Sequence, residues 1–116
     1  MLEQVLKPLS QNEAACYQRY DWTTKRLAEW HEIQPTEYLI LEGVSSSRQA
    51  FRPYLTLTIW IETPRVERLR RGLERDDEGA RAQWGIWMAH EDEYIVCEHP
   101  EQTADVVIDG MVPCTI

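Results

Sequence analysis

The chain of 116 residues lacks several patterns that define common protein classes. It contains no G-x-x-x-x-G-K-[ST] loop, the motif that cradles nucleotide phosphates in many enzymes. Its cysteines, Cys16, Cys97 and Cys114, are odd in number and form no C-x-x-C pair, which argues against a disulfide framework or a zinc site. No apolar run approaches the ~18 residues of a membrane span, and the start of the chain shows no secretion signal. We therefore expect a cytoplasmic protein with no membrane partner.

Basic residues are also few. The chain has 12 Lys and Arg against 20 Asp and Glu, a formal net charge of -8, whereas a nucleic-acid-binding surface needs the opposite sign. We therefore exclude nucleic acid as a partner. Half of the basic residues are nevertheless arginines in one short stretch, namely Arg65, Arg68, Arg70, Arg71, Arg75 and Arg81. A small phosphorylated ligand thus stays a candidate for a local positive site.

What the sequence does contain predicts one α/β domain over residues 1–116. The hydrophobic fraction of 43% and the charged fraction of 28% are near globular averages. Apolar runs at 38–41, 55–61 and 104–110 are expected to be buried strands, with helical patterns between them. Strands separated by helices favour parallel pairing, so we expect about three strands in a small parallel sheet flanked by helices.

Helices are predicted from apolar residues at helical spacing. They are expected near 2–9, 22–33, 64–76 and 81–96, with a further short helical piece over 48–51. In the third of these, Thr63 is expected to cap the helix and Pro64 to occupy its first position. His99-Pro100 is expected to end the fourth.

The arginines of the third helix are the leading candidates for anion binding. Arg68, Arg71 and Arg75 recur at three- and four-residue spacing, so they project from one side of a helix, and guanidinium groups suit phosphate oxygens. The alternative is a solvated helix face on which the arginines pair with neighbouring acids, which are Glu67, Glu74 and Asp76.

Two further groups are candidate ligand-binding residues. Glu42 follows the predicted strand 38–41, and the carboxyl end of such a strand is where an open α/β sheet binds ligands, so Glu42 could lie beside hydrated magnesium or be a solvated acid. Tyr20-Asp21-Trp22 places two aromatic rings around a carboxylate. This set could stack on a base and accept hydrogen bonds from hydroxyls, or serve packing alone.

Taken in order, four segments resemble the uridine kinase family of P-loop nucleoside kinases. They are Tyr20-Asp21-Trp22, the run 39–44 that contains Glu42-Gly43, the arginine segment 68–76, and the run 103–108. The similarity extends from about residue 17 to residue 110 and implies that the chain corresponds to the C-terminal part of a nucleoside kinase with a partial P-loop-kinase-like three-layer fold. The complete family uses ATP and Mg²⁺ to phosphorylate a ribonucleoside 5′-hydroxyl; no cofactor is assigned to this chain.

The resemblance also implies roles for individual residues. Tyr20, Asp21 and Trp22 would bind the nucleoside, and Glu42 would lie near the metal. Arg68, Arg71 and Arg75 would bind phosphate, with Arg71 and Arg75 catalytic. This chain departs from the family at Gly72, which stands where the family has one arginine of its lid pair.

Because the phosphate loop is missing and phosphoryl transfer depends on positioning and charge stabilisation, we expect no kinase activity from this chain alone. The alternatives are a non-catalytic nucleotide- or protein-binding module, or a subunit whose sheet is completed in a homodimer or by a separate phosphate-loop chain.

Overall fold

The structure, a computed structural model, describes residues 1–112, so Cys114 lies outside the described residues. Its contacts divide the chain into two compact units, which we call unit 1 (Met1–Leu55) and unit 2 (Thr56–Ile116). We predicted a single domain over residues 1–116. Whether the two units fold as one domain stays a prediction. Mixed α/β structure, the coarser part of the expected fold, is confirmed.

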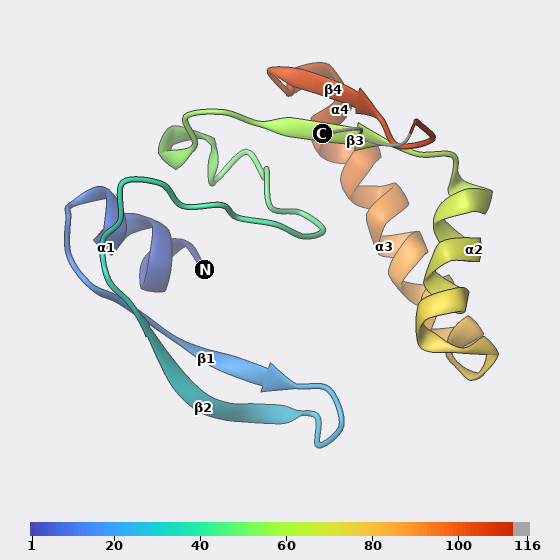
Figure 1. Ribbon diagram of the computed structural model, residues 1–116, viewed down its shortest axis with the longest axis horizontal. Coiled ribbons are helices and arrows are strands. Elements are labelled where there is room, and N and C mark those ends of the chain that lie inside the picture. Colours follow the sequence, from blue (N-terminus) through green and yellow to red (C-terminus); the bar gives the residue numbers. More distant parts are fainter. Residues whose placement is uncertain (113–116) are drawn as a thin grey trace. The chain divides into compact units, whose positions relative to one another are not determined.

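Unit 1 begins with a helical segment and continues into a β-hairpin (Figure 1). The segment consists of a π-helical stretch (Leu2–Leu6) and α1 (Lys7–Ser10), close to the helix predicted at 2–9. Val5 and Leu6 are buried on its inner side, and Ala15 is fully buried where the first strand of the hairpin starts. These apolar residues form the small core of unit 1.

The hairpin replaces the helix predicted at 22–33, so that prediction is wrong. Strand β1 (Ala15–Asp21) pairs antiparallel with β2 (Arg26–Ile33), and the register shifts between Gln18 and Tyr20. The spacing of Leu27, Trp30 and Ile33 is helical. However, short apolar patterns do not separate helix from strand, and the tyrosines and tryptophans of this region favour strands.

The rest of unit 1 is mostly irregular, and it contradicts the strand predicted at 38–41. These residues adopt no strand; Tyr38 and Ile40 are 82% and 89% exposed. The helical piece predicted at 48–51 is also displaced, because the structure has a single 3₁₀ turn, Arg52–Tyr54, that contains Pro53. Pro53 is the second residue of this turn and does not prevent it, since proline is tolerated in the first turn of a helix.

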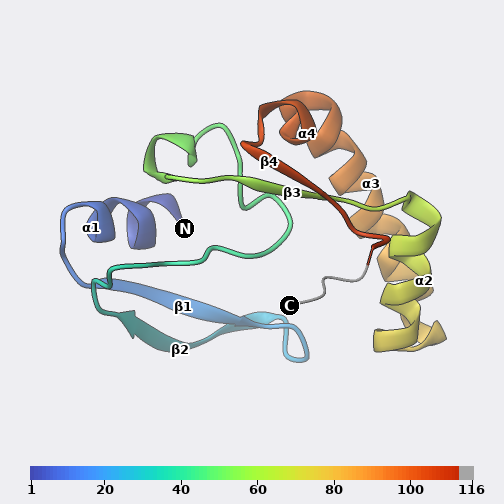
Figure 2. The same ribbon diagram turned by 45° about the horizontal axis from the view of Figure 1, so that its top comes forward.

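In unit 2, three α-helices lie between the two strands along the chain (Figure 2). Strand β3 (Ile59–Glu62) leads into α2 (Arg65–Asp76), and a 3₁₀ turn (Glu78–Ala80) leads into α3 (Arg81–Glu98). His99 takes a left-handed conformation that ends α3, as expected. The short helix α4 (Pro100–Thr103) then precedes β4 (Val106–Asp109).

Strands β3 and β4 pair in parallel, as expected for strands joined by a helical crossover. Only these two strands form the sheet among the residues that the structure describes, fewer than the number predicted. The expectation of buried strands is also wrong here. Ile59 and Ile61 are 51% and 60% exposed, and every residue of β4 is exposed.

Side-chain hydrogen bonds hold β3 and β4 together just before the two strands begin; we call this contact between Thr58 and Asp105 the clamp. The Asp105 carboxylate accepts hydrogen bonds from the backbone N–H and the hydroxyl of Thr58, both at 2.7 Å. At the other end, the Gly110 N–H donates to the Glu62 carbonyl at 2.7 Å. A Cβ on Gly110 would lie 3.0 Å from that carbonyl oxygen, so the close approach of the two strand ends depends on glycine.

Helices α2 and α3 contact each other through a glycine. A Cβ on Gly72 would lie 2.6 Å from Cε2 of the Trp84 ring, so any side chain there would collide with the tryptophan. Leu73, Met88 and Tyr94 are the buried apolar side chains of these helices. Helix α2 begins at Arg65, one residue later than predicted, and Thr63 makes no capping hydrogen bond. No helix within residues 1–112 is both long and apolar enough to cross a membrane.

Candidate functional site

The predicted anion-binding arginines lie on α2, and one of them, Arg71, contacts the residue that follows β4. Their helix follows β3 directly, and this position is where α/β sheets bind ligands. Each of the three arginines, however, already has partners within unit 2. Whether these guanidinium groups can bind a phosphate depends on the acidic and carbonyl groups that they already contact.

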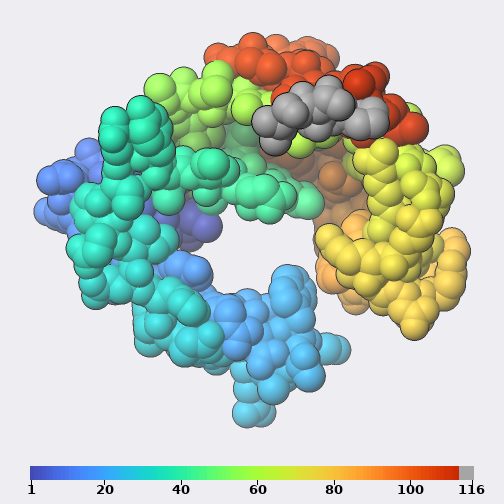
Figure 3. Space-filling model, viewed as in Figure 1, coloured from blue at the N-terminus to red at the C-terminus, as the bar shows by residue number. Residues whose placement is uncertain are grey.

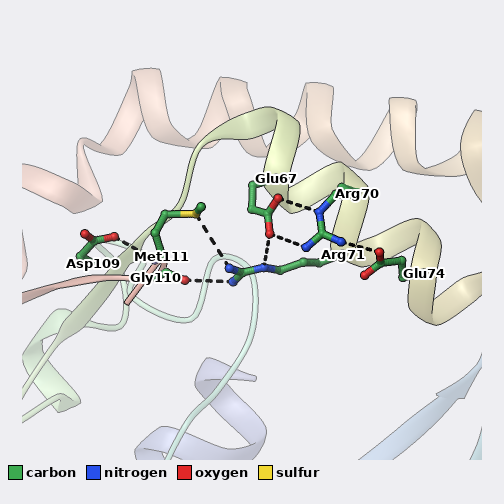
Figure 4. A network of polar contacts seen from close by, with 7 residues as sticks. All are labelled: Glu67, Arg70, Arg71, Glu74, Asp109, Gly110 and Met111. Atoms are coloured by element: carbon green, nitrogen blue, oxygen red, sulfur yellow. Dashed lines mark hydrogen bonds and ion pairs between the residues drawn. The ribbon is translucent and has the colours of Figure 1, made fainter. Parts of the chain in front are cut away.

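Arg71 is held by three groups (Figure 4). Its Nε donates to the Glu67 carboxylate at 2.7 Å, its Nη1 donates to the Gly110 carbonyl at 3.0 Å, and its Nη2 lies 3.9 Å from Sδ of Met111. The guanidinium therefore joins α2 to the end of β4. A phosphate at this position would have to displace a carboxylate and a backbone carbonyl.

Glu67 is shared by two arginines. Arg70 donates to both of its carboxylate oxygens, at 2.7 and 2.6 Å, and also contacts Glu74. The hydrogen bonds from Arg70 and then from Arg71 lower the pKa of Glu67 to about 2. The carboxylate thus stays ionised at neutral pH, and it neutralises the arginines that were predicted to attract an anion.

Arg68 and Arg75 point to other partners. Arg68 pairs with Glu91 of α3, and both side chains are partly buried between the helices. Arg75 binds Asp76 through two contacts, at 2.7 and 2.9 Å, and lies over the Trp84 ring. The three predicted phosphate ligands therefore share one side of a helix but do not converge on a common ligand position.

Arg65 is a further bridge that the sequence reasoning did not assign. It donates to Asp92 of α3 at 3.0 Å, next to the contact between Arg68 and Glu91. The signal was present in the sequence as a run of acids, Glu91-Asp92-Glu93, on the helix that follows the arginines. This region therefore fits the alternative interpretation, in which the arginines of α2 pair with acidic side chains, better than it fits an open cationic site.

A shallow groove of about 520 Å³ runs along another side of α2. Val66, Leu69 and Leu73 form its apolar lining, and Arg70 and Arg81 lie at its rim. Both rim arginines are held by carboxylates, since Arg81 binds Glu78 through two contacts at 2.8 Å. The groove therefore presents an apolar surface between neutralised charges.

Tyr20, Asp21 and Trp22 lie at the turn of the hairpin in unit 1 (Figure 3, light blue). The Asp21 carboxylate accepts hydrogen bonds from the N–H groups of Thr23 and Thr24, at 2.8 and 3.2 Å, and these bonds lower its pKa. This is the Asx-turn arrangement that favours a tight chain reversal. An aspartate before two threonines was thus a turn signal that the helix prediction overlooked.

The two aromatic rings of this set pack on each other. Tyr20 and Trp22 form an edge-to-face pair with centroids 4.9 Å apart, and they are 41% and 70% exposed. The rings are accessible, but they contact each other and do not stand parallel to hold a base between them. Asp21 is engaged by the turn and does not project between the rings.

Glu42 is exposed in an irregular segment and does not end a strand. Gly43 follows with a φ of 134°, and its carbonyl accepts from the Ser46 N–H in a turn. The predicted magnesium role of Glu42 depended on a position at the end of a strand, and Glu42 does not have that position. Within the described part of the chain, no three His, Cys, Asp or Glu side chains gather in a way that could hold a metal ion.

The chain matches no protein-family model, and no curated protein matches it.

Proposed function

We propose that this chain is a uridine-kinase-like protein that lacks catalytic competence and acts as a cytoplasmic protein-binding module. The observation that carries the proposal is the parallel pair β3 and β4. Parallel strands occur almost only in sheets with both faces covered. Here Ile59, Ile61, Val106, Val107 and Ile108 are 40–60% exposed, and no third strand joins this pair among residues 1–112. Such a sheet is completed by association with another polypeptide.

The charge arrangement supports the non-catalytic part of the proposal. A phosphoryl-transfer site needs cations aimed at the position of the phosphates. Arg71 and Arg75, the arginines predicted to be catalytic, are instead bound by Glu67 and Asp76. Catalysis would require these ion pairs to open in addition to the supply of a phosphate loop.

A coupled phosphotransfer assay tests this reading. Purified protein with ATP, Mg²⁺ and uridine or cytidine is expected to give no turnover above a blank, and the double variant Arg71→Ala/Arg75→Ala is expected to behave identically. Turnover by the unmodified protein that the double variant loses would refute the proposal and restore the catalytic roles of both arginines.

Nucleoside binding at the hairpin is the second candidate function, and the exposure of Tyr20 and Trp22 favours it. A ligand at 100 times its Kd raises the free energy of unfolding by ~2.7 kcal/mol, so thermal shifts report it. A shift with uridine that Trp22→Ala abolishes and Trp87→Ala retains would support this candidate. The leading proposal expects no shift with ATP.

A further inference from the structure

Within residues 1–112, no strand pairs with the outer edge of β3. The inference from this edge rests on the proposed protein-binding function. The Thr58 carbonyl accepts from the N–H of Val106 in β4, and the Glu62 carbonyl accepts from the N–H of Gly110, the residue after β4. Because backbone groups alternate in direction along a strand, Ile59 and Ile61 direct their N–H and C=O groups away from β4. The outer edge of β3 therefore offers two donors and two acceptors.

This edge lacks several of the usual protections against pairing, although the strand is short and ends in the charged Glu62. Natural edge strands are guarded by lysine, proline, bulges or an inward-pointing charge. The segment Thr58-Ile59-Trp60-Ile61-Glu62 has no lysine, arginine or proline, and its pairing with β4 is regular. Two of its side chains, those of Ile59 and Ile61, are more than half exposed.

We propose that the partner is a second copy of this chain, paired antiparallel through β3 about a two-fold axis that passes beside Trp60. In this register Ile59 lies opposite Ile61 of the partner subunit, as a pair that exchanges both backbone hydrogen bonds. Trp60 lies opposite the partner's Trp60, an aromatic cross-strand pair of the kind that stabilises sheets. The result is a four-stranded sheet in the order β4, β3, β3, β4.

The side chains of β3 match each other in this register. Glu62 faces Thr58 of the partner subunit, so the two Glu62 carboxylates are not opposite each other. Apolar residues face apolar residues, and the polar residues at the strand ends face polar residues. On one face of the sheet, Ile59, Ile61, Val106 and Ile108 of both copies form a continuous aliphatic surface, since paired residues share a face.

The outer edge of β4 is a poorer choice. Its outward-directed residues are Val107 and Asp109, so the equivalent self-pairing would place the Asp109 carboxylate against an aliphatic side chain. Asp109 also accepts from the Met111 N–H at 2.8 Å, which turns the chain away at the end of the strand. A symmetric contact, in which each copy presents the same patch, is therefore assigned to β3.

Proline substitutions test which edge pairs. Ile61→Pro removes an outward N–H and leaves the hydrogen bonds between β3 and β4 intact, because proline is tolerated where the N–H faces away from the sheet. Val107→Pro makes the matched change at the β4 edge. By light scattering, the unmodified protein and Val107→Pro are expected at twice 13.7 kDa, and Ile61→Pro at 13.7 kDa. A monomeric unmodified protein, or a dimer lost only in Val107→Pro, would overturn the inference.

Cysteine crosslinking tests the register, in a background with Cys16, Cys97 and Cys114 changed to serine. Trp60→Cys is expected to form a disulfide-linked dimer on oxidation, because directly opposite residues of this kind have Cα atoms ~4.5 Å apart. If that variant does not fold, a mixture of Ile59→Cys and Ile61→Cys chains replaces it. The mixture is expected to crosslink, and each variant alone is not.

The outcomes separate this inference from the proposed function. A dimer without either crosslink refutes the β3 register and leaves a protein-binding module that uses another surface. A monomer with nucleoside phosphotransfer activity refutes the proposed function itself. Crosslinking at Trp60 together with loss of the dimer in Ile61→Pro supports both.

Discussion

Unit 1 and unit 2 differ in how far apart in the sequence their paired strands lie. In unit 1, β1 and β2 are joined by a four-residue turn, and local contacts such as the Arg19–Glu29 ion pair at 2.6 Å hold them. In unit 2, β3 and β4 are separated by α2, α3 and α4. The hairpin forms its hydrogen bonds between neighbouring segments of the chain, whereas the parallel pair depends on the helices between its strands and has no further strand beside it among residues 1–112.

The two units also differ in charge. Unit 1 has seven acidic and six basic side chains, whereas unit 2 has thirteen acidic and six basic ones, a net charge of -7. In unit 2 the surplus of acids neutralises the arginines of α2. In unit 1 a carboxylate, Asp21, is used instead to bind backbone N–H groups. In both units, charged groups predicted to bind ligand are engaged by the fold.

The largest effect is expected at the contact between α2 and α3. Gly72→Ala places a methyl group against the Trp84 ring, and overpacking of this kind costs about 1–3 kcal/mol of unfolding free energy. Gly85→Ala is the matched control in α3, where no atom lies within 4 Å of the added Cβ. It is expected to stabilise by up to about 1 kcal/mol through helix propensity. Urea denaturation measures both, and equal effects would contradict the close contact of α2 and α3.

The next effect concerns the clamp that joins β3 to β4. Hydrogen bonds from Thr58 lower the pKa of Asp105, so its contribution to stability is present above the ordinary aspartate pKa of 3.8 and is lost as pH falls through the folded-state value. Asp105→Ala is expected to lower the urea midpoint at pH 7 and to reduce the difference between pH 7 and pH 3.

Thr58→Val serves as the partner variant in that experiment. If the clamp is formed, the double variant with Asp105→Ala should lose less than the two single losses added together. Strict additivity would show that the Thr58 hydroxyl does not interact with Asp105; the backbone N–H of residue 58 is retained in Thr58→Val.

A smaller, local effect is expected at the charge network of α2. The pKa of Glu67 lies at about 2 because Arg70 and Arg71 donate to it, so the contribution of this network is present above the ordinary glutamate pKa of 4.5 and is lost as pH falls toward 2. Arg70→Ala should raise the pKa of Glu67 toward its ordinary value in a carboxyl titration followed by NMR. Arg65→Ala, whose partner is Asp92, should leave it unchanged.

The smallest effect is expected in the hairpin. Asp21→Ala removes the acceptor for the N–H groups of Thr23 and Thr24, so these two amides should exchange faster with solvent while those of α2 keep their rates. Asp21→Asn retains an acceptor and should exchange at nearly the original rate. Slow exchange of both amides in Asp21→Ala would mean that the carboxylate does not hold the turn.

The same contrast explains what the sequence could predict. In unit 2 the helix α2 was predicted because Val66, Leu69 and Leu73 repeat over a long segment, and α3 because its length and its end at His99-Pro100 are clear. Parallel pairing followed from the order of elements. The start of β3 was misplaced because the run 55–61 contains no sequence break, whereas the pairing with β4 begins only at Ile59, opposite Val106.

In unit 1 the sequence was less informative. Residues 22–33 fit a helical spacing, and only the turn chemistry of Asp21 and the cross-strand pairs distinguish the hairpin. Residues 38–41 were predicted as a strand from apolarity alone, yet a strand also needs a neighbour with which to pair. Among the candidate site residues, the arginines could be placed on α2 from the sequence. Their pairing with Glu67, Asp76 and Glu91 could not, because it depends on side-chain rotamers and on the packing of α3.

The most direct test of the central claim, that the β3 edge is closed by a second copy, is residue-resolved amide hydrogen exchange at high and low protein concentration. The account predicts that the amides of Ile59 and Ile61 are protected at high concentration and lose that protection on dilution. It also predicts that those of Val106 and Gly110, which donate to β3, stay protected throughout. Rapid exchange of Ile59 and Ile61 at every concentration would contradict it.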